Sequence, residues 1–385
     1  MNVLFLANSS SGLLRFRREL LESLVLRSYN VFFAVPRGDF IEEMQQMGCR
    51  FIETEISRHG TNPLTDLALI KKYCSIIKSV KPDIVFTYTI KPNVYGGIAC
   101  QLCKVPYVAN VTGLGTAVEN GGILQKITLA LYRTGMRKAK RVFFQNQANQ
   151  DFMLRHKVVK GAYSLLPGSG VNLARFAPLP YSEETDGIHF VFISRIMREK
   201  GIEQYLAAAK YFKSKFAELA EAPDSRHSDR RRGEESSAVP RTTFHICGFC
   251  EPEYKGKLDD YIKNGTVIYH GIVRDVREIH KISHCTIHPS FYPEGISNVL
   301  LESCASARPI ITTDRSGCKE VVDDGVNGYV VKQCDSEDLI KKIEKFLALT
   351  HEQKMQMGLA GRAKVEKEFD RQIVVNAYLK ELENM

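Results

Sequence analysis

Apolar runs that suit buried strands alternate with helical patterns along the first part of the chain. The order is a strand-like run at Val3–Ala7, a polar loop at Asn8–Gly12, a helical pattern at Leu13–Leu26 and a second strand-like run at Val31–Val35. This order predicts a strand–loop–helix–strand unit of an α/β fold. In the helical pattern only Arg17 interrupts the apolar face. Either a solvated side chain or a contact with a ligand would explain a cation at this position.

The alternation continues in two series, which predicts two domains. Further strand-like runs in the first series are Asp83–Tyr88, Tyr107–Val111 and Arg141–Gln145. A stretch rich in Pro and Gly then leads to a second series that begins near Ile188. We predict Rossmann-like domains at residues 1–172 and 188–367, a hinge at 173–187 and a final helix at 368–385. Residues 220–241 are polar and lack periodicity, which predicts a disordered surface insertion.

The composition is that of a soluble globular protein. The chain has 385 residues, of which 44% are hydrophobic and 25% charged. No apolar run approaches the roughly 20 residues that span a bilayer. The first apolar run lacks a preceding basic segment, so we expect a strand rather than a signal peptide. The ten cysteines are scattered, which favours reduced thiols and a cytoplasmic location.

The sequence offers little for a metal site. The Cys-x-x-Cys pairs Cys100/Cys103 and Cys247/Cys250 come from opposite halves of the chain, which favours incidental thiols over structural zinc. Three histidines are spaced by four residues, but Pro289 and a strand-like run break any continuous helix through them. These histidines are His280, His284 and His288. No Asp-x-Asp triplet occurs, so we predict a diphosphate site that needs no metal.

Positive charge is concentrated in the first half of the chain. Residues 1–180 contain 23 Lys and Arg against 11 Asp and Glu, a net charge of +12, whereas the remainder has 30 against 33, a net charge of −3. We see no nucleic-acid-binding motif, and an anionic membrane surface would attract such a face. The segment Ile123–Arg141 mixes apolar and basic residues and is the best docking candidate. An ordinary crossover helix explains the same segment, and both interpretations can hold.

The stretch Pro289–Glu302 carries the most chemical information. It is predicted to leave a buried strand, pass through a Gly-containing loop and enter a helix capped by Ser297 or Asn298. Glu294 then precedes the helix, and Glu302 lies about one turn inside it. In a parallel sheet this junction opens where ligands bind, at the carboxyl ends of the strands. Free amides favour anionic oxygen and carboxylates accept hydrogen bonds from hydroxyls. An ordinary crossover helix with an exposed Glu remains the alternative.

A second strand-to-helix junction adds two cations. Ile188–Ser194 is a strand-like run, Arg195 follows it directly, and Lys200 precedes the helical pattern Ile202–Phe216. Two fixed cations beside free amides suit a diphosphate. Their predicted position at the same sheet edge as Glu294 argues against a purely solvated role.

Together these motifs resemble the family 4 retaining glycosyltransferases. The resemblance rests on Ser-Arg-x4-Lys-Gly from Ser194, on Glu-Gly with a second Glu eight positions after the first, and on segments from Arg308 to Gly328. The N-terminal half resembles one branch of that family, which adds galactose or N-acetylhexosamine to undecaprenyl-diphosphate-linked sugars. Its shared segments are Ser57-Arg58, Asn62-Pro63, Lys91–Gly96, Val111–Gly115 and Pro167–Asn172.

This resemblance implies the α/β GT-B fold, in which two Rossmann-like domains face each other across a cleft and the last helix returns to the first domain. It implies that residues 1–172 bind the acceptor and residues 188–367 the nucleotide sugar. It implies a UDP-sugar donor, an undecaprenyl-diphosphate-linked saccharide as acceptor, no metal, and a place on the inner face of the cytoplasmic membrane. Retention of configuration is attributed to attack on the face that the diphosphate leaves. A phosphate oxygen then takes the acceptor proton, so no dedicated carboxylate base is required.

The resemblance also implies roles for individual residues. Arg195 and Lys200 would bind the diphosphate, Glu294 the donor sugar and Glu302 the ribose. Further contacts with the donor are expected at Gly12, Gly295, Ile296 and Ser297. Residues near the acceptor or the sugar are expected to be Arg58, Lys91, Thr112, Gly113 and Gly115. Many family members have His where this chain has Thr112, so no imidazole-based role is assigned here.

Two other function classes remain open. A nucleotide-sugar epimerase of the same fold would isomerise its substrate without an acceptor and would not need the basic N-terminal half. A basic membrane-binding or nucleic-acid-binding protein without chemistry is the third possibility. The joint presence of four candidate site residues argues against a protein without chemistry. These residues are Arg195, Lys200, Glu294 and Glu302.

Overall fold

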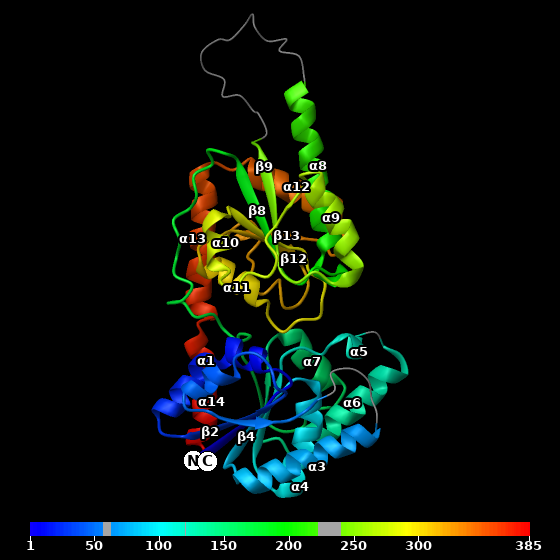
Figure 1. Ribbon diagram of the computed structural model, residues 1–385, viewed down its shortest axis with the longest axis vertical. Coiled ribbons are helices and arrows are strands. Elements are labelled where there is room, and N and C mark those ends of the chain that lie inside the picture. Colours follow the sequence, from blue (N-terminus) through cyan, green and yellow to red (C-terminus); the bar gives the residue numbers. More distant parts are fainter. Residues whose placement is uncertain (57–62, 120, 222–239) are drawn as a thin grey trace, which may run out of the picture. The chain divides into compact units, whose positions relative to one another are not determined.

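A computed structural model describes residues 1–56, 63–119, 121–221 and 240–385 (Figure 1). The chain divides into two compact units. Unit 1 comprises Met1–Asn172, Pro293–Asn298 and Phe369–Met385, and unit 2 comprises Leu173–Tyr292 and Val299–Glu368. Most of the predicted insertion, residues 222–239, lies outside the described residues. No helix in the described ranges combines the length and apolarity needed to cross a bilayer.

Unit 1 is built on a seven-stranded parallel sheet with the order β3-β2-β1-β4-β5-β6-β7. Its strands are β1 (Asn2–Leu6), β2 (Asn30–Val35), β3 (Arg50–Glu53), β4 (Ile84–Tyr88), β5 (Tyr107–Val111), β6 (Arg141–Phe144) and β7 (Tyr163–Leu165). Its helices are α1 (Ser10–Leu26), α2 (Ile41–Gln46), α3 (Pro63–Val80), the π-helical η1 (Pro92–Gly96), α4 (Gly97–Cys103), α5 (Thr116–Glu119), α6 (Gly122–Met136), α7 (Gln147–Arg155) and α14 (Arg371–Glu383).

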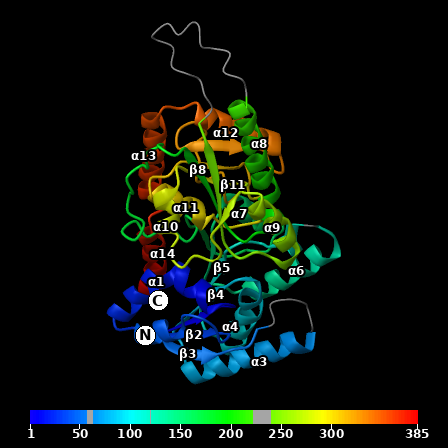
Figure 2. The same ribbon diagram turned by 45° about the horizontal axis from the view of Figure 1, so that its top comes forward.

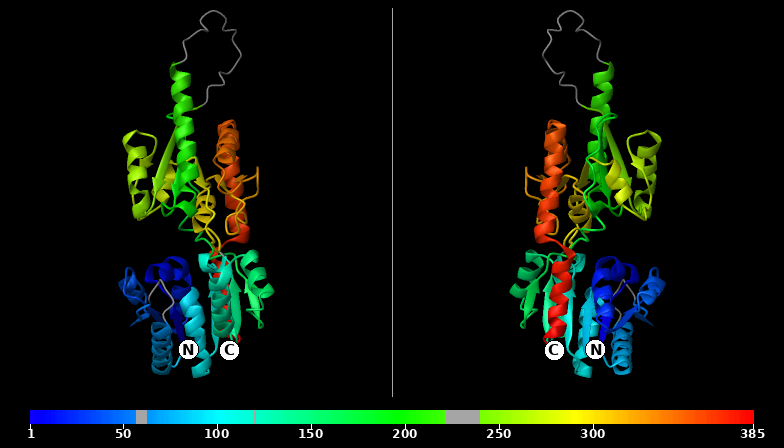
Figure 3. Two further views of the ribbon diagram at one scale, coloured as in Figure 1. Left: turned by 90° about the vertical axis from the view of Figure 1, so that its right-hand side faces the viewer. Right: turned by 90° about the vertical axis from the view of Figure 1, so that its left-hand side faces the viewer.

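Helices cover both faces of this sheet (Figure 3). Alternate residues of β1 point to opposite faces, so Val3 and Phe5 pack with α1 and α14, while Leu4 and Leu6 pack with α3, α4 and α6. Because both faces are buried, the strands are continuous apolar runs, as the sequence predicted. The predicted strands and the first helix are confirmed to within a few residues.

Arg17 and the last helix share one core of unit 1. Arg17 is 3% exposed, and its guanidinium carbon lies 5.2 Å and 5.5 Å from the ring centroids of Tyr88 and Tyr378. Tyr378 donates a hydrogen bond to Asn110. Of the two explanations for Arg17, the solvated one is therefore wrong. The side chain is buried between aromatic rings from β4 and α14.

Unit 2 contains a six-stranded parallel sheet with the order β10-β9-β8-β11-β12-β13. Its strands are β8 (Ile188–Ile193), β9 (Thr242–Cys247), β10 (Ile268–Tyr269), β11 (Cys285–His288), β12 (Ile310–Thr313) and β13 (Gly328–Val331). Its helices are the 3-10 turns η2 (Arg198–Lys200) and η3 (Pro252–Tyr254), α8 (Ile202–Glu221), α9 (Lys255–Lys263), α10 (Arg277–Ile282), α11 (Asn298–Ala305, which begins in unit 1), α12 (Ser336–Leu347) and α13 (His351–Glu368).

Helices α8 and α12 pack side by side on one face of the unit 2 sheet (Figure 2). On the other face, Val191 and Ile193 of β8 pack against Ile279 of α10 and Val299 of α11. The two sheets confirm the prediction of two Rossmann-like α/β domains. In both, residues singled out from the sequence lie just after the carboxyl ends of strands, among them Thr112 after β5 and Arg195 after β8.

Candidate functional site

Three side chains form a compact cation cluster in unit 2, defined here as Arg195, Lys200 and Tyr292. Arg195 follows β8, Lys200 ends η2, and Tyr292 lies in the loop after β11. The ring centroid of Tyr292 is 4.7 Å from Nζ of Lys200 and 5.7 Å from the guanidinium carbon of Arg195. One aromatic ring therefore holds both predicted diphosphate ligands by cation–π contacts.

Backbone contacts fix the loop of Lys200 against the loop after β11. The amide of Phe291 donates to the carbonyl of Glu199 over 2.9 Å, and Oγ of Ser290 donates to the same carbonyl over 3.4 Å. Gly201 has a φ of +77°, and a Cβ there would lie 2.1 Å from the carbonyl oxygen of Pro289. Only glycine permits this approach, so the Lys200-Gly201 turn is specific to this packing.

Lys200 is a buried cation with an altered titration. Lys200 is only 9% exposed. This burial, with a further contribution from the charge of Arg195, lowers the pKa of Lys200 to about 8. Burial and the neighbouring Lys200 lower the pKa of His288 to about 3, so this imidazole is neutral. A bound anion would favour the ammonium form of Lys200 and raise its pKa again.

Arg195 is the more exposed of the two cations. Its Nη1 lies 3.5 Å from Oε1 of Glu251, a residue in the loop after β9. Because this ion pair is partly exposed, it orients the guanidinium without committing all five of its donors. Arg195 can therefore still donate to an anionic ligand at this edge of the sheet.

The carboxyl end of β12 lies beside that of β11 in the unit 2 sheet. Oγ1 of Thr312 donates to the carbonyl of His288 over 2.8 Å. In the following loop, Glu320 accepts from the amide of Gly317 over 2.7 Å and from Oγ of Ser316 over 2.9 Å. Glu320 thus fixes the loop after β12, while Glu302 lies half-buried inside α11. Helix α11 begins at Asn298, directly after Ser297, which is one of the two predicted caps.

The segment Pro293–Asn298 makes its contacts within unit 1. Nδ2 of Asn146 donates to the carbonyls of Glu294 and Gly295 over 2.9 Å and 2.6 Å. A Cβ on Gly295 would lie 2.2 Å from Oε1 of Gln145 and 2.6 Å from the carbonyl oxygen of Thr112. Gly295 of the predicted donor set therefore meets Thr112 of the predicted acceptor set, and Glu294 lies beside Gly113.

Other residues of the segment Pro293–Asn298 also lie against loops of unit 1. Ile296 and Ser297 are buried, and a Cβ on Gly168 would lie 2.6 Å from Cβ of Ile296. A Cβ on Gly113 would lie 3.3 Å from the carbonyl oxygen of Pro293. Gly115 has a φ of +72° before α5, which glycine adopts readily.

Gly12 and Lys91 of the predicted set lie elsewhere in unit 1. The amide of Gly12, in the first turn of α1, donates to Oγ of Ser9 over 3.2 Å. Nζ of Lys91 donates to Oδ1 of Asp66 over 3.1 Å, and the hydroxyl of Tyr95 donates to Oδ2 over 2.6 Å. Arg58 lies outside the described residues, so its predicted role stays a prediction.

Sequence reasoning missed three residues of this arrangement. Tyr292 was inside the informative stretch, but its ring could not be placed over both cations without coordinates. Asn146 lies two residues after β6 and caps α7, accepting from the amide of Asn149 over 2.8 Å, so its position after a strand was an available signal. Asp66 lies on α3 and no pattern in the sequence distinguished it.

The structure also bears on metal binding. Within residues 1–56, 63–119, 121–221 and 240–385, no group of three or more His, Cys, Asp or Glu side chains is arranged to hold a metal ion.

Comparisons with known proteins agree with this geometry. Residues 180–364 match the family "Glycosyl transferases group 1", and residues 2–146 match "Glycosyl transferase 4-like". A relative from Campylobacter jejuni, N,N'-diacetylbacillosaminyl-diphospho-undecaprenol alpha-1,3-N-acetylgalactosaminyltransferase, is 23% identical over 99% of this chain and 98% of its own length. An Escherichia coli relative, UDP-Gal:alpha-D-GlcNAc-diphosphoundecaprenol alpha-1,3-galactosyltransferase, is 23% identical over 72% of this chain and 69% of its own length.

Among solved structures, Anabaena Alr3699/HepE in complex with UDP superimposes with a TM-score of 0.77 at 17% identity, covering 100% of both chains. Sucrose-phosphate synthase from Thermosynechococcus elongatus superimposes with a TM-score of 0.74, also at 17% identity, covering 100% of this chain and 98% of that one. These likenesses show the fold.

Proposed function

Because the chain belongs to the glycosyltransferases of the GT-B fold, we propose that it transfers a hexose or an N-acetylhexosamine from a UDP-sugar to a lipid-linked saccharide. The transferred sugar is N-acetylgalactosamine, galactose or N-acetylglucosamine, and the acceptor is linked to undecaprenyl diphosphate. The product serves bacterial surface polysaccharide or glycoprotein glycan synthesis. The two relatives named for lipid-diphosphate-linked acceptors support this substrate class.

The cation cluster carries the proposal. The ring of Tyr292 holds Lys200 and Arg195 beside the carboxyl ends of β8 and β11, where α/β folds bind ligands. Departure of the nucleoside diphosphate develops negative charge, and cations that are already fixed lower that barrier. Lys200 and Arg195 therefore stabilise the leaving group, and the reaction proceeds without a bound metal ion.

The carboxylates orient the donor in this proposal. Glu302 accepts hydrogen bonds from the ribose hydroxyls, and Glu294 accepts them from the donor sugar. The backbone amides of Gly295, Ile296 and Ser297 contact the sugar and phosphate oxygens. The acceptor hydroxyl attacks on the face that the diphosphate leaves, a phosphate oxygen takes its proton, and the anomeric configuration is retained.

The experiment is a transfer assay with purified protein, UDP-sugars and an undecaprenyl-diphosphate-linked saccharide. We expect release of UDP that depends on both substrates, a lipid product extended by one sugar, and an unchanged anomeric configuration by NMR. Chelation of divalent cations should leave the rate unchanged. Conversion of the UDP-sugar into an isomer without acceptor would instead identify a nucleotide-sugar epimerase and refute the proposal.

We further propose that unit 1 docks on an anionic membrane through one face. This docking face is formed by α3, α4 and α6, where α4 contacts both other helices (Figure 1). Its exposed apolar residues are Leu64, Leu67, Leu102, Ile123, Leu124 and Ile127. Its exposed basic residues are Lys71, Lys78, Lys104 and Lys126.

Helix α6 supports both interpretations of the segment Ile123–Arg141. Leu129 and Tyr132 are buried in the unit 1 core, as in an ordinary crossover helix. Ile123 remains 78% exposed at the start of the same helix. Apolar insertion together with about 1 kcal/mol per nearby basic residue would bind an anionic surface.

Vesicle co-sedimentation tests this docking face. Wild-type protein should bind vesicles that contain phosphatidylglycerol, bind neutral phosphatidylcholine vesicles weakly, and dissociate as salt increases. The variant I123S/I127S should lose binding, whereas L359S, which changes an exposed residue of α13 in unit 2, should not. Equal binding by both variants and wild type would refute the assignment.

A further inference from the structure

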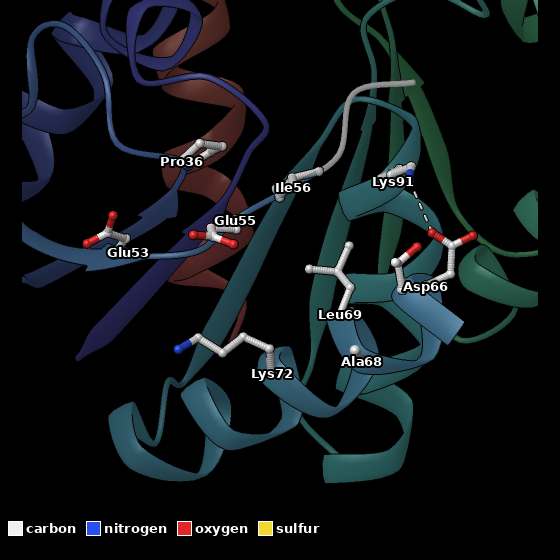
Figure 4. Close-up of a pocket in the computed structure, with 10 residues that line it drawn as sticks. Pro36, Glu53, Glu55, Ile56, Asp66, Ala68, Leu69, Lys72 and Lys91 are labelled. Atoms are coloured by element: carbon white, nitrogen blue, oxygen red, sulfur yellow. Dashed lines mark hydrogen bonds and ion pairs between the residues drawn. The ribbon is translucent and has the colours of Figure 1, made fainter. Parts of the chain in front are cut away.

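A pocket in unit 1 lies outside the residues assigned to the donor. It has a volume of about 880 Å³, within the range of pockets that bind small molecules. It is lined by Pro36 after β2, by the end of β3 and the residues after it, and by one side of α3, together with Lys91 after β4 (Figure 4). The lining residues are Pro36, Glu53, Glu55, Ile56, Thr65, Asp66, Ala68, Leu69, Lys72 and Lys91.

The position of the pocket suits a substrate site. Its walls come from the carboxyl ends of β2, β3 and β4. In a parallel sheet these ends share one edge with the loops after β1 and β5, which hold Gly12 and Thr112–Gly115. The pocket therefore opens on the sheet edge where α/β folds bind their ligands.

The walls combine apolar surface with hydrogen-bonding groups. Figure 4 shows Glu53, Glu55 and Lys72 on one side of Leu69 and the Lys91–Asp66 pair on the other. Such a lining matches a saccharide, which presents apolar C–H faces and a rim of hydroxyls. Carboxylates accept hydrogen bonds from those hydroxyls.

Asp66 is the most firmly held acceptor of the pocket. It is 8% exposed, and its two oxygens accept from Nζ of Lys91 over 3.1 Å and from the hydroxyl of Tyr95 over 2.6 Å. A carboxylate offers about four acceptor sites, so Asp66 retains capacity for a ligand hydroxyl. Its preset orientation reduces the entropy lost on binding.

The charge of the lining decides between sugar and phosphate. Among the described residues, the lining has three carboxylates, on Glu53, Glu55 and Asp66, against two ammonium groups, on Lys72 and Lys91. Lys91 is already paired with Asp66, and Glu53 is paired with Arg37 over 3.2 Å. Because these described residues carry no excess positive charge, they disfavour a diphosphate and favour a neutral saccharide.

Helix α3 separates this pocket from a second hollow of about 570 Å³ that is apolar and basic. The second hollow is lined by Leu67, Ile70, Lys71, Cys74, Ser75, Lys78 and Leu102, some of which belong to the docking face. A helix with its side chains is about 10 Å wide. One helix thus places a polar pocket next to a surface suited to lipid.

We propose that the pocket bounded by Glu55, Asp66 and Lys72 binds the neutral saccharide of the lipid-linked acceptor and thereby selects it. This inference rests on the proposed function, because it takes the lipid-linked saccharide of that function as the ligand. The diphosphate and the lipid chain lie on the other side of α3, beside Lys71 and Lys78.

The test measures acceptor and donor kinetics separately in full-length variants. E55Q and D66N each remove a charged acceptor of hydroxyl hydrogen bonds, and we expect the KM for the lipid-linked saccharide to rise about tenfold or more. The KM for the UDP-sugar should stay unchanged. The matched control E42Q, at an exposed residue of α2, should behave as wild type.

A filling variant guards against loss of folding as the explanation. Ala68 lines the pocket from an exposed position, so A68W should block the saccharide and leave the thermal midpoint near that of wild type. S79W, at an exposed position of the same helix, is its control. If A68W and E55Q transfer sugar with an unchanged acceptor KM, the pocket assignment is wrong while the proposed function stands. If wild type transfers no sugar to any lipid-linked saccharide, the proposed function itself fails.

Discussion

Raising the pH above about 8 is expected to weaken use of the donor, because Lys200 then loses its charge. Burial lowers the pKa of this lysine from 10.5 to about 8, and an uncharged amine cannot neutralise a diphosphate. Above that pKa, each further pH unit removes about nine-tenths of the ammonium form. We therefore expect kcat/KM for the UDP-sugar to fall about tenfold per pH unit.

The same titration affects the free energy of unfolding in the opposite direction. In the unfolded chain Lys200 titrates near 10.5, so between pH 8 and 10.5 the unfolded state binds more protons than the folded state. The contribution of Lys200 to stability therefore increases with pH there, by up to about 3 kcal/mol. Titration of Lys200 therefore does not promote unfolding between pH 8 and 10.5, so unfolding caused by this titration cannot explain a loss of activity there.

The assay is the initial rate of UDP release at low donor concentration between pH 7 and 10, with circular dichroism recorded at each pH. K200M should be slow and should lack the alkaline step. K210M, at an exposed lysine of α8, should show the wild-type profile. A flat wild-type profile, or an unchanged step in K200M, would refute the role assigned to Lys200.

Three further predictions concern the scaffold. Y292L should raise the KM for the UDP-sugar several-fold because both cations lose their shared ring, whereas Y292F should not. Equal kinetics of the two variants would contradict this role. G201A should destabilise unit 2 by about 2 kcal/mol or more in urea unfolding, since its Cβ would collide with the carbonyl of Pro289. An unchanged urea midpoint would contradict that packing. Burial lowers the pKa of His245 and of His284 to about 4, so below pH 6.5 the unfolded chain binds protons that the folded chain does not. Stability should decrease as pH falls from 6.5 to 4, by about 2 kcal/mol per histidine at pH 5, and H245Q should reduce the slope. A constant free energy of unfolding between pH 6.5 and 4 would contradict this effect of the two histidines.

The fold was predictable because its determinants are local in sequence. Parallel strands buried on both faces are continuous apolar runs, and Gly, Pro and Asn separate them from helices. Ile188–Ser194 was therefore identified as a strand from its apolar run alone. Arg195 and Lys200 could be placed at its carboxyl end for the same reason.

The contacts that assemble the site depend on residues far apart in the sequence. No local pattern indicates that Tyr292 contacts both Arg195 and Lys200, because side-chain orientation is set by packing. The grouping of Pro293–Asn298 with unit 1 depends on Asn146, and the burial of Arg17 depends on α14. Helix α8 extends to Glu221, past the predicted Phe216, because helix ends are weakly marked in sequence.

Mass analysis of the lipid product tests the central claim most directly. Purified protein is incubated with a UDP-hexose or UDP-N-acetylhexosamine and an undecaprenyl-diphosphate-linked saccharide, and the lipid is analysed before and after. We expect the acceptor to gain one sugar residue in wild type and in K210M, and to gain far less in K200M. An acceptor mass that stays unchanged with every UDP-sugar, or an equal gain in K200M, would contradict the account.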